Sequence, residues 1–157
     1  DYLTMHIWPF NWSWLNPKDM LGTIDTAIAN TGKYMDDHLE VARRLKKPIV
    51  FEEFGLPRDG FTFTPGSPVK LRDKYYEFSF NRVLESAKNN DVMAGANFWT
   101  FSGTGLPNPG NENHMWKKGD DYLGDPPQEA QGLNSVFIGD STMLIVKDVN
   151  EKLKSIL

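Results

Sequence analysis

The segment KPIVFEEFG, residues 47–55, predicts a short buried β-strand that delivers carboxylates at its C-terminal end. Pro48 stands where a strand begins, and residues 49–51 form an apolar run of the kind found in parallel sheets that are covered on both faces. Glu52 and Glu53 end this run, and a glycine then breaks the strand. A carboxylate in such a place is costly to desolvate, so it requires a partner or a chemical task.

The rest of the chain repeats the same order of a strand, a long loop and a helix. The expected strands are residues 2–8, 48–54 and 92–99, the loops after them are 9–22, 55–68 and 100–134, and the helices are roughly 23–46, 69–90 and 141–156. Strands that alternate with helices predict a parallel sheet of the α/β class. Three parallel strands cannot close into a barrel and leave two bare edges, so we expect the chain to be part of a larger fold or to need a partner that completes the sheet.

The composition excludes several classes of function. The formal net charge of -4 and the absence of a long basic run argue against a nucleic-acid surface. The chain contains no cysteine, which excludes a disulfide scaffold and a thiolate metal site, and no His-x-His or HExxH spacing predicts a metal centre. No segment approaches the ~18–20 apolar residues of a membrane span. We therefore predict no metal, no nucleic-acid partner and no membrane partner.

Polar and aromatic side chains mark the carboxyl end of each expected strand. His6 and Trp8 end the first strand, Glu53 ends the second, and Asn97 and Trp99 end the third. Because parallel strands end at the same rim of a sheet, and catalytic groups of (β/α)8 barrels lie at that rim, these side chains are expected to form one site. The convergence of three strand ends favours a functional interpretation more than any single residue does.

Strict alternation along the second strand predicts how the residues around Glu53 are directed. If Glu53 faces the axis of a barrel, Ile49 and Phe51 face it as well, and Glu52 faces the surrounding helices. A slip of one residue would exchange the two carboxylates, so Glu52 stays an alternative to Glu53 at this point.

Each candidate also has a purely structural interpretation. Glu53 alone is equally suited to pair with a buried arginine. A histidine or a tryptophan at a strand end is, taken alone, more often a core residue. The tryptophans of the expected loops, Trp12 and Trp116 among them, either cover apolar surface or stack on sugars.

Four motifs, taken together and in this order, resemble a known family of enzymes. They are HIWP at 6–9, KPIVFEEFG at 47–55, ANFWTFSG at 96–103 and GDPPQEAQGLNSVFIGDST at 124–142. This set resembles glycoside hydrolase family 5, and within it the endo-β-1,4-mannanases. The resemblance implies a (β/α)8 barrel in which residues 1–157 supply strands six to eight with their helices, as the C-terminal part of one catalytic domain. The N-terminal part of the barrel is absent from this chain.

The resemblance also implies roles for the residues at the strand ends. The family's nucleophile, the glutamate before Phe-Gly, corresponds to Glu53. The family has a histidine and, two residues later, usually a tyrosine, where this chain has His6 and Trp8; the indole N–H can donate to the nucleophile as a phenol does, or the ring only forms a wall. The family's tryptophan platform under the sugar corresponds to Trp99. The remaining substrate-binding candidates are Asn97, Trp12 and Trp116.

The family's second catalytic carboxyl group is missing from this chain. In the family it belongs to an Asn-Glu pair at the end of strand four, whereas Asn111–Glu112 lies in an expected loop and Asn150–Glu151 in the last helix. A retaining glycosidase needs two carboxyl groups ~5–5.5 Å apart, one as nucleophile and one as acid/base. We therefore expect this chain to supply the nucleophile, and the N-terminal half of the barrel, in the same protein or as a companion chain, to supply the acid/base.

The sequence thus predicts a retaining endo-β-1,4-mannanase that hydrolyses mannan, glucomannan or galactomannan without a cofactor. The substrate class implies a secreted or periplasmic protein. Two alternatives stay open at this point: a β-1,4-glucanase of the same family, and a non-catalytic carbohydrate-binding fragment that uses the tryptophans.

Overall fold

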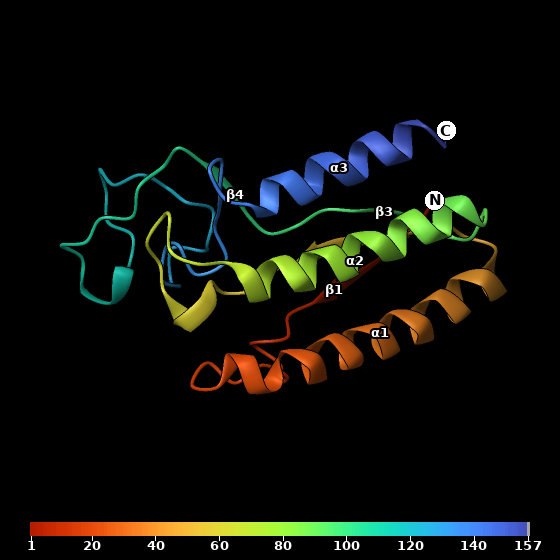
Figure 1. The fold of residues 1–157 in the computed structure, drawn as a ribbon, viewed down its shortest axis with the longest axis horizontal. Coiled ribbons are helices and arrows are strands. Elements are labelled where there is room, and N and C mark those ends of the chain that lie inside the picture. Colours follow the sequence, from red (N-terminus) through yellow and green to blue (C-terminus); the bar gives the residue numbers. More distant parts are fainter. Residues whose placement is uncertain (157) are drawn as a thin grey trace.

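Three parallel strands form the central sheet, in the order β1 (Leu3–Ile7), β2 (Ile49–Phe54) and β3 (Met93–Ala96). The helices are α1 (Met20–Leu45), α2 (Lys70–Lys88) and α3 (Thr142–Lys154). This computed structural model describes residues 1–156. The three helices run in one direction and the strands run in the other, so that the long loops after the strands gather at one end of the molecule (Figure 1). The α/β class and the parallel sheet predicted from the sequence are confirmed.

Helix α1 forms because its apolar residues recur every three or four positions, which places them on one face. The buried residues of that face are Met20, Ile24, Ala27, Thr31, Met35, Leu39 and Ala42. Its N-terminus is capped by Asp19, whose side chain accepts a hydrogen bond from the Gly22 N–H at 2.9 Å. The helix was predicted to begin at about Thr23, and the cap at Asp19 explains why it begins earlier.

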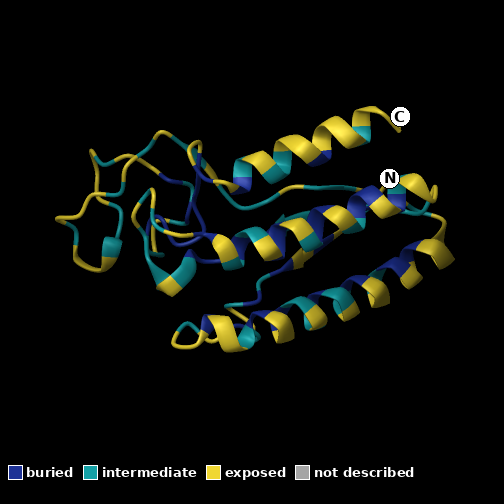
Figure 2. Ribbon diagram, viewed as in Figure 1, coloured by how far each residue is buried: buried dark blue, intermediate teal, exposed yellow. Residues whose placement is uncertain are grey.

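An aromatic core joins the central strand to helix α2. The rings of Phe51 and Phe54 stack at 4.2 Å, and Phe54 packs against Tyr76 at 5.0 Å. All three side chains are fully buried, and the inward faces of α1 and α2 are buried along their length (Figure 2). Burial of a large apolar side chain stabilises a fold by ~1.5–3 kcal/mol, so this cluster anchors β2 firmly against α2.

The long segment after β3 contains structure that the sequence did not reveal. Strand β4 (Phe101–Gly103) and strand β5 (Val136–Phe137) pair in parallel as a second, small sheet, and a turn of 3-10 helix lies at Glu112–His114. A further turn of 3-10 helix, Asp59–Phe61, lies in the loop between β2 and α2. Strand β3 is correspondingly shorter than the predicted 92–99. These strands have only two and three residues, too few for an alternating pattern to stand out.

A buried ion pair ties the loops to the start of α3. The Arg58 guanidinium, which has no exposed surface, donates to Asp140 Oδ2 at 2.7 Å and Oδ1 at 2.6 Å. Asp140 Oδ2 also accepts from the Phe137 backbone N–H at 2.9 Å. The equally buried Arg72 donates to the carbonyl oxygens of Leu56 and Ser135, both at 2.7 Å. These bonds fix the segments that follow β2 and β5 to each other.

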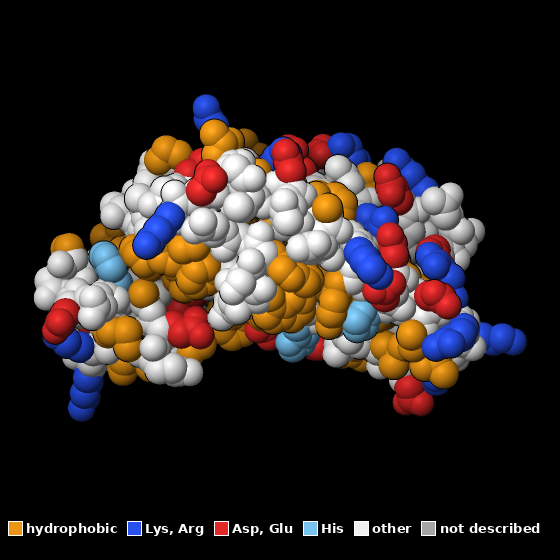
Figure 3. Space-filling model, turned by 90° about the horizontal axis from the view of Figure 1, so that it is seen from below, with side chains coloured by type: hydrophobic (Ala, Val, Ile, Leu, Met, Phe, Trp, Pro, Cys, Tyr) orange, Lys and Arg blue, Asp and Glu red, His pale blue; other side chains and the backbone are white. Residues whose placement is uncertain are grey.

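One side of the molecule shows a shallow apolar groove. Within residues 1–156, β1 pairs with β2 alone, so its other edge is uncovered. The groove between this edge and α1 is lined by Leu3, Thr4, Asp37, His38, Val41 and Ile49. Figure 3, which views the molecule from below Figure 1, shows hydrophobic side chains along the middle of that face. No helix within the described residues is both long and apolar enough to cross a bilayer.

We predict that Asp140→Asn lowers the free energy of unfolding by about 3–5 kcal/mol, because the amide leaves the buried Arg58 without a counter-charge. The measurement is urea denaturation. The matched control is Asp148→Asn on the exposed face of α3, where a pair with Lys152 at 2.6 Å is solvated and the expected change is within about 0.5 kcal/mol. A loss below about 1 kcal/mol for Asp140→Asn would contradict this role of the buried pair.

Candidate active site

A β-bulge sets the direction of the two carboxylates at the end of β2. Met5 pairs with Phe51, but the next residue, His6, pairs with Glu53, so Glu52 is the extra residue of the bulged strand. Alternation is broken at this point. The prediction that Ile49 and Phe51 face the same side of the sheet as Glu53 is therefore wrong.

The residues before the bulge belong to the core side of the sheet. Ile49 and Phe51 are buried in the apolar core. Glu52 does not face the helices either: its side chain is 42% exposed and lies beside His6. Both carboxylates thus lie on the side of the sheet opposite α1 and α2, which we call the open face.

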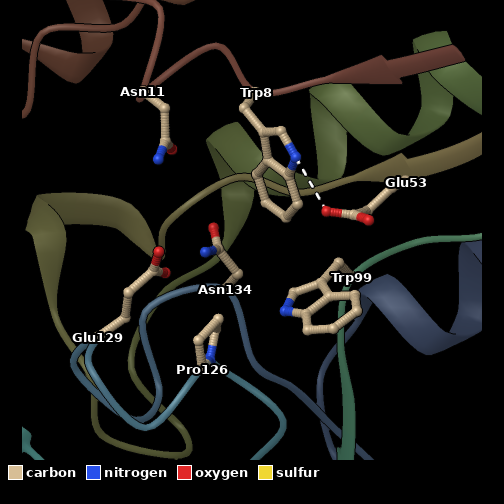
Figure 4. Close-up of a pocket in the computed structure, with 7 residues that line it drawn as sticks. All are labelled: Trp8, Asn11, Glu53, Trp99, Pro126, Glu129 and Asn134. Atoms are coloured by element: carbon tan, nitrogen blue, oxygen red, sulfur yellow. Dashed lines mark hydrogen bonds between the residues drawn. The ribbon is translucent and has the colours of Figure 1, made fainter.

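Glu53 has a different partner at each carboxylate oxygen. The Trp8 indole Nε1–H donates to Oε1 at 3.1 Å, as the dashed line in Figure 4 shows. The imidazole Nδ1 of His6 lies 3.5 Å from Oε2. The other ring nitrogen of His6, Nε2, lies 3.6 Å from Glu52 Oε2. Of the two roles that the sequence left open for Trp8, the donor role is the one that this geometry supports.

Glu53, Trp8 and Trp99 line a pocket at the carboxyl ends of the strands (Figure 4). The Trp99 backbone N–H donates to the Phe54 carbonyl at 2.7 Å, which holds the start of the third loop against β2. Gly55 makes the close approach possible: a Cβ there would lie 2.6 Å from the Trp99 carbonyl oxygen and 2.9 Å from the Trp8 ring. The glycine of the EEFG motif is thus required by the packing between the two tryptophans.

Two further predicted residues do not line this pocket. His6 contacts both carboxylates from the open face, and its side chain is 46% exposed. Asn97 is exposed, and its backbone N–H donates to the Phe51 carbonyl at 2.8 Å. Its neighbour Phe98 packs against Tyr76 of α2, with the ring centroids 5.7 Å apart.

The structure does not bring the two predicted loop tryptophans to the pocket. Trp12 packs edge-on against Trp14 at 4.9 Å and against Tyr34 of α1 at 5.2 Å. Trp116 donates its indole N–H to the Asp120 carbonyl at 3.1 Å and packs against Tyr122. Within the described residues, therefore, Trp12 packs against its own loop and α1, Trp116 packs against its own loop, and a role in substrate binding stays a prediction for each.

Four further residues line the pocket that were not predicted from the sequence. They are Asn11, Pro126, Glu129 and Asn134. Three of them belong to the motif at 124–142, in which no regular pattern of spacing marks a residue as part of a site. Asn11 lies two residues after the HIWP motif, in a loop whose path could not be predicted.

A buried carboxylate shapes the loop that carries this wall of the pocket. Asp125 has no exposed surface and accepts hydrogen bonds from the Gly132 N–H at 3.0 Å, the Asn134 N–H at 3.3 Å and the Ser135 hydroxyl at 3.2 Å. Burial raises the pKa of the Asp125 carboxyl group above its ordinary value. Burial and, secondarily, the charge of Asp125 raise the pKa of the Glu129 carboxyl group as well.

The chemistry that this arrangement supports is that of a carboxylate held by N–H donors beside two aromatic walls. Among residues 1–156, no group of three or more histidine, aspartate or glutamate side chains could hold a metal ion. An aromatic face suits the apolar face of a pyranose ring, and a carboxylate beside it is the group that glycosidases use at the anomeric carbon.

Comparison with known proteins agrees with this class of site. A family model described as "GH family 5 beta-mannosidase-like" matches residues 1–157. Mannan endo-1,4-beta-mannosidase 3 of Arabidopsis thaliana is 34% identical over 110 residues, which cover 69% of this chain and 24% of that protein. Mannan endo-1,4-beta-mannosidase 4 of Solanum lycopersicum is 29% identical over 107 residues, which cover 68% of this chain and 24% of that protein.

Solved structures of known proteins resemble the fold of nearly the whole chain. The glycoside hydrolase family 5 mannosidase from Rhizomucor miehei superposes with a TM-score of 0.88 at 33% identity, covering 99% of this chain and 38% of that one. The endo-beta-1,4-mannanase from Thermotoga petrophila, at 21% identity and a TM-score of 0.51, shares the fold. The chain belongs to a family of glycoside hydrolases. The matching family is the GH family 5 beta-mannosidase-like family, in agreement with the resemblance of the sequence motifs to family 5. The chain spans about a quarter of the length of the curated relatives described above.

We predict that Trp8→Phe lowers kcat/KM for an aryl β-mannoside by about 10- to 100-fold in the protein with a complete barrel. The ring stays, but the donor to Glu53 is lost, and a hydrogen bond to a charged group contributes ~1.5–3 kcal/mol. Trp8→Tyr, which supplies a phenol donor, should recover a substantial part of the rate. Equal rates for Trp8→Phe and the unchanged protein would show that the indole is only a wall.

Proposed function

We propose that this chain supplies the nucleophile side of a retaining glycosidase that cleaves β-1,4-mannosidic bonds, with Glu53 as the nucleophile. The observation that carries the proposal is the position of Glu53: its carboxylate lies in a pocket walled by Trp8 and Trp99, and it accepts the Trp8 N–H at 3.1 Å. The mannan-cleaving relatives and the mannosidase from R. miehei, one variant of which was solved with mannosyl-fructose, support a β-mannoside as the substrate.

The proposed reaction proceeds in two displacements. A Glu53 oxygen forms a bond to the anomeric carbon while the glycosidic C–O bond breaks, and the leaving oxygen takes a proton from a second carboxyl group. That group then removes a proton from water, which attacks the anomeric carbon and releases Glu53. Trp99 provides the flat apolar surface on which the sugar lies, and the Trp8 N–H keeps the Glu53 carboxylate oriented for attack.

The second carboxyl group is proposed to come from the N-terminal part of a (β/α)8 barrel, in the same protein or in a companion chain. In this proposal residues 1–157 are strands six to eight of that barrel, the C-terminal part of one catalytic domain. The uncovered edge of β1 and the groove beside it support this arrangement. So does the small volume of the pocket, about 170 Å³, against the ~300–1,000 Å³ of a complete ligand site.

Two observations bear on which β-mannosides are cleaved. The plant relatives are named endo-mannosidases, which supports attack within a mannan or glucomannan chain. The R. miehei structure, with a TM-score of 0.88, is named a mannosidase without the word endo, so release of terminal mannose is kept as a second candidate. The products from a mannan oligosaccharide separate the two modes.

The β-1,4-glucanase alternative has less support, because the relatives described above act, by their names, on mannosides. A polysaccharide substrate also supports the proposal that the protein is secreted or periplasmic.

We predict that Glu53→Gln in the complete protein lowers kcat by at least about 1,000-fold, as expected when one member of a catalytic unit is removed. The amide keeps the shape of the side chain but cannot attack as an anion. Oligosaccharide binding, measured by calorimetry, should persist. Turnover close to that of the unchanged protein would refute the assignment of Glu53.

We predict that residues 1–157 alone hydrolyse no β-mannoside, because the second carboxyl group is not in place. Glu129 is the other carboxylate among the pocket-lining residues and is therefore the alternative candidate for the acid/base. It lines the wall opposite Glu53 in Figure 4, and burial raises its pKa. Hydrolysis by the isolated chain that is lost in Glu129→Gln would overturn the prediction and assign the acid/base role to Glu129. Recovery of activity on adding the N-terminal part would support it.

A further inference from the structure

We infer that Glu52 is a positioning residue, which holds the imidazole of His6 in place against the nucleophile. This inference rests on the proposed function of Glu53 and names a residue that the two-carboxylate mechanism does not include. It depends on the bulge: Glu52 is the unpaired residue between Phe51 and Glu53, and the bulge interrupts alternation, so that Glu52 and Glu53 both lie on the open face beside His6.

The geometry places the ring of His6 between two carboxylates. Nδ1 lies 3.5 Å from Glu53 Oε2, and Nε2 lies 3.6 Å from Glu52 Oε2. These separations are within ion-pair range and slightly longer than ordinary hydrogen bonds. A neutral imidazole carries one N–H, whereas the imidazolium ion carries two. Only the imidazolium ion can therefore present a donor to both carboxylates at once.

This arrangement defines the orientation of the Glu53 carboxylate. Trp8 donates to Oε1 from one side, and His6 faces Oε2 from the other. Two partners on two oxygens restrict rotation of the carboxylate plane, which favours a geometry ready for attack. Glu52 restricts the ring of His6 in the same way, because it engages the nitrogen that points away from Glu53.

Glu52 also keeps a negative charge beside His6 when Glu53 loses its own. In the proposed glycosyl-enzyme, Glu53 is an ester and carries no charge, so Glu52 becomes the remaining acidic partner of the ring. Among the described residues, the ion pairs formed by Glu52 involve His6 alone, and Glu52 does not line the pocket. A direct contact of Glu52 with the sugar is therefore not part of the inference.

A double-mutant cycle in the protein with a complete barrel tests the inference. The variants are Glu52→Gln, His6→Gln and the pair, with Glu40→Gln on the exposed side of α1 as the matched control. With an aryl β-mannoside as substrate, Glu52→Gln is expected to lower kcat by about 10-fold with KM nearly unchanged, and the pair is expected to be no slower than His6→Gln alone. The control should match the unchanged protein.

Two kinetic outcomes would overturn the inference while leaving Glu53 as nucleophile. If Glu52→Gln behaves like Glu40→Gln, Glu52 has no role in the site. If the losses of the two single variants multiply in the pair, Glu52 acts independently of His6. An unchanged protein that cleaves no β-mannoside, or an active Glu53→Gln variant, would instead remove the proposed function.

A nitrogen-15 NMR measurement of the His6 ring tests the same contact without relying on turnover. Glu52→Gln should shift the ring resonances of His6, and the shorter but charged Glu52→Asp should shift them less. Glu40→Gln should leave them unchanged. Ring resonances that do not respond to either substitution at Glu52 would contradict the inference, whether or not the protein is active.

Discussion

The bulge at Glu52 is the constraint on which the open face of the sheet depends. The strand must bury Phe51 and Phe54 against α2 and still present Glu53 on the opposite face. A regular strand cannot meet both demands, because Phe51 and Glu53 would share a face. One extra residue resolves the conflict, and it lets Trp8 reach the Glu53 carboxylate from the neighbouring strand end.

Buried charges outside the pocket hold the loops that form its wall. Arg58 and Asp140 join the segment after β2 to the start of α3, and Asp125 gathers the backbone around Asn134. Buried ionic groups are costly to desolvate, so each of these carboxylates is satisfied by several donors. The Pro/Gly-rich loops can therefore be irregular in sequence and still have a defined shape beside Trp99.

Much of this site could be predicted from the sequence, because parallel strands bring their ends to one rim. That rule placed Trp8, Glu53 and Trp99 together, and all three line the pocket. The prediction of side-chain directions failed where β2 is irregular. Glu52 lies on the open face and not toward the helices, because a one-residue bulge interrupts alternation, and no sequence pattern reveals such a bulge. Loop residues such as Glu129 were missed because their position depends on contacts distant in sequence, made through Asp125.

The most direct test of the account is to identify the residue that becomes covalently bonded to the sugar. The protein with a complete barrel would be treated with a fluorinated mannosyl fluoride, whose glycosyl-enzyme hydrolyses slowly, then digested and mapped by mass spectrometry. One added fluoromannosyl group is expected, on Glu53, and none in Glu53→Gln. A label on Glu52 or Glu129, or inversion of configuration in the product with no label at all, would contradict the assignment of Glu53 as the nucleophile.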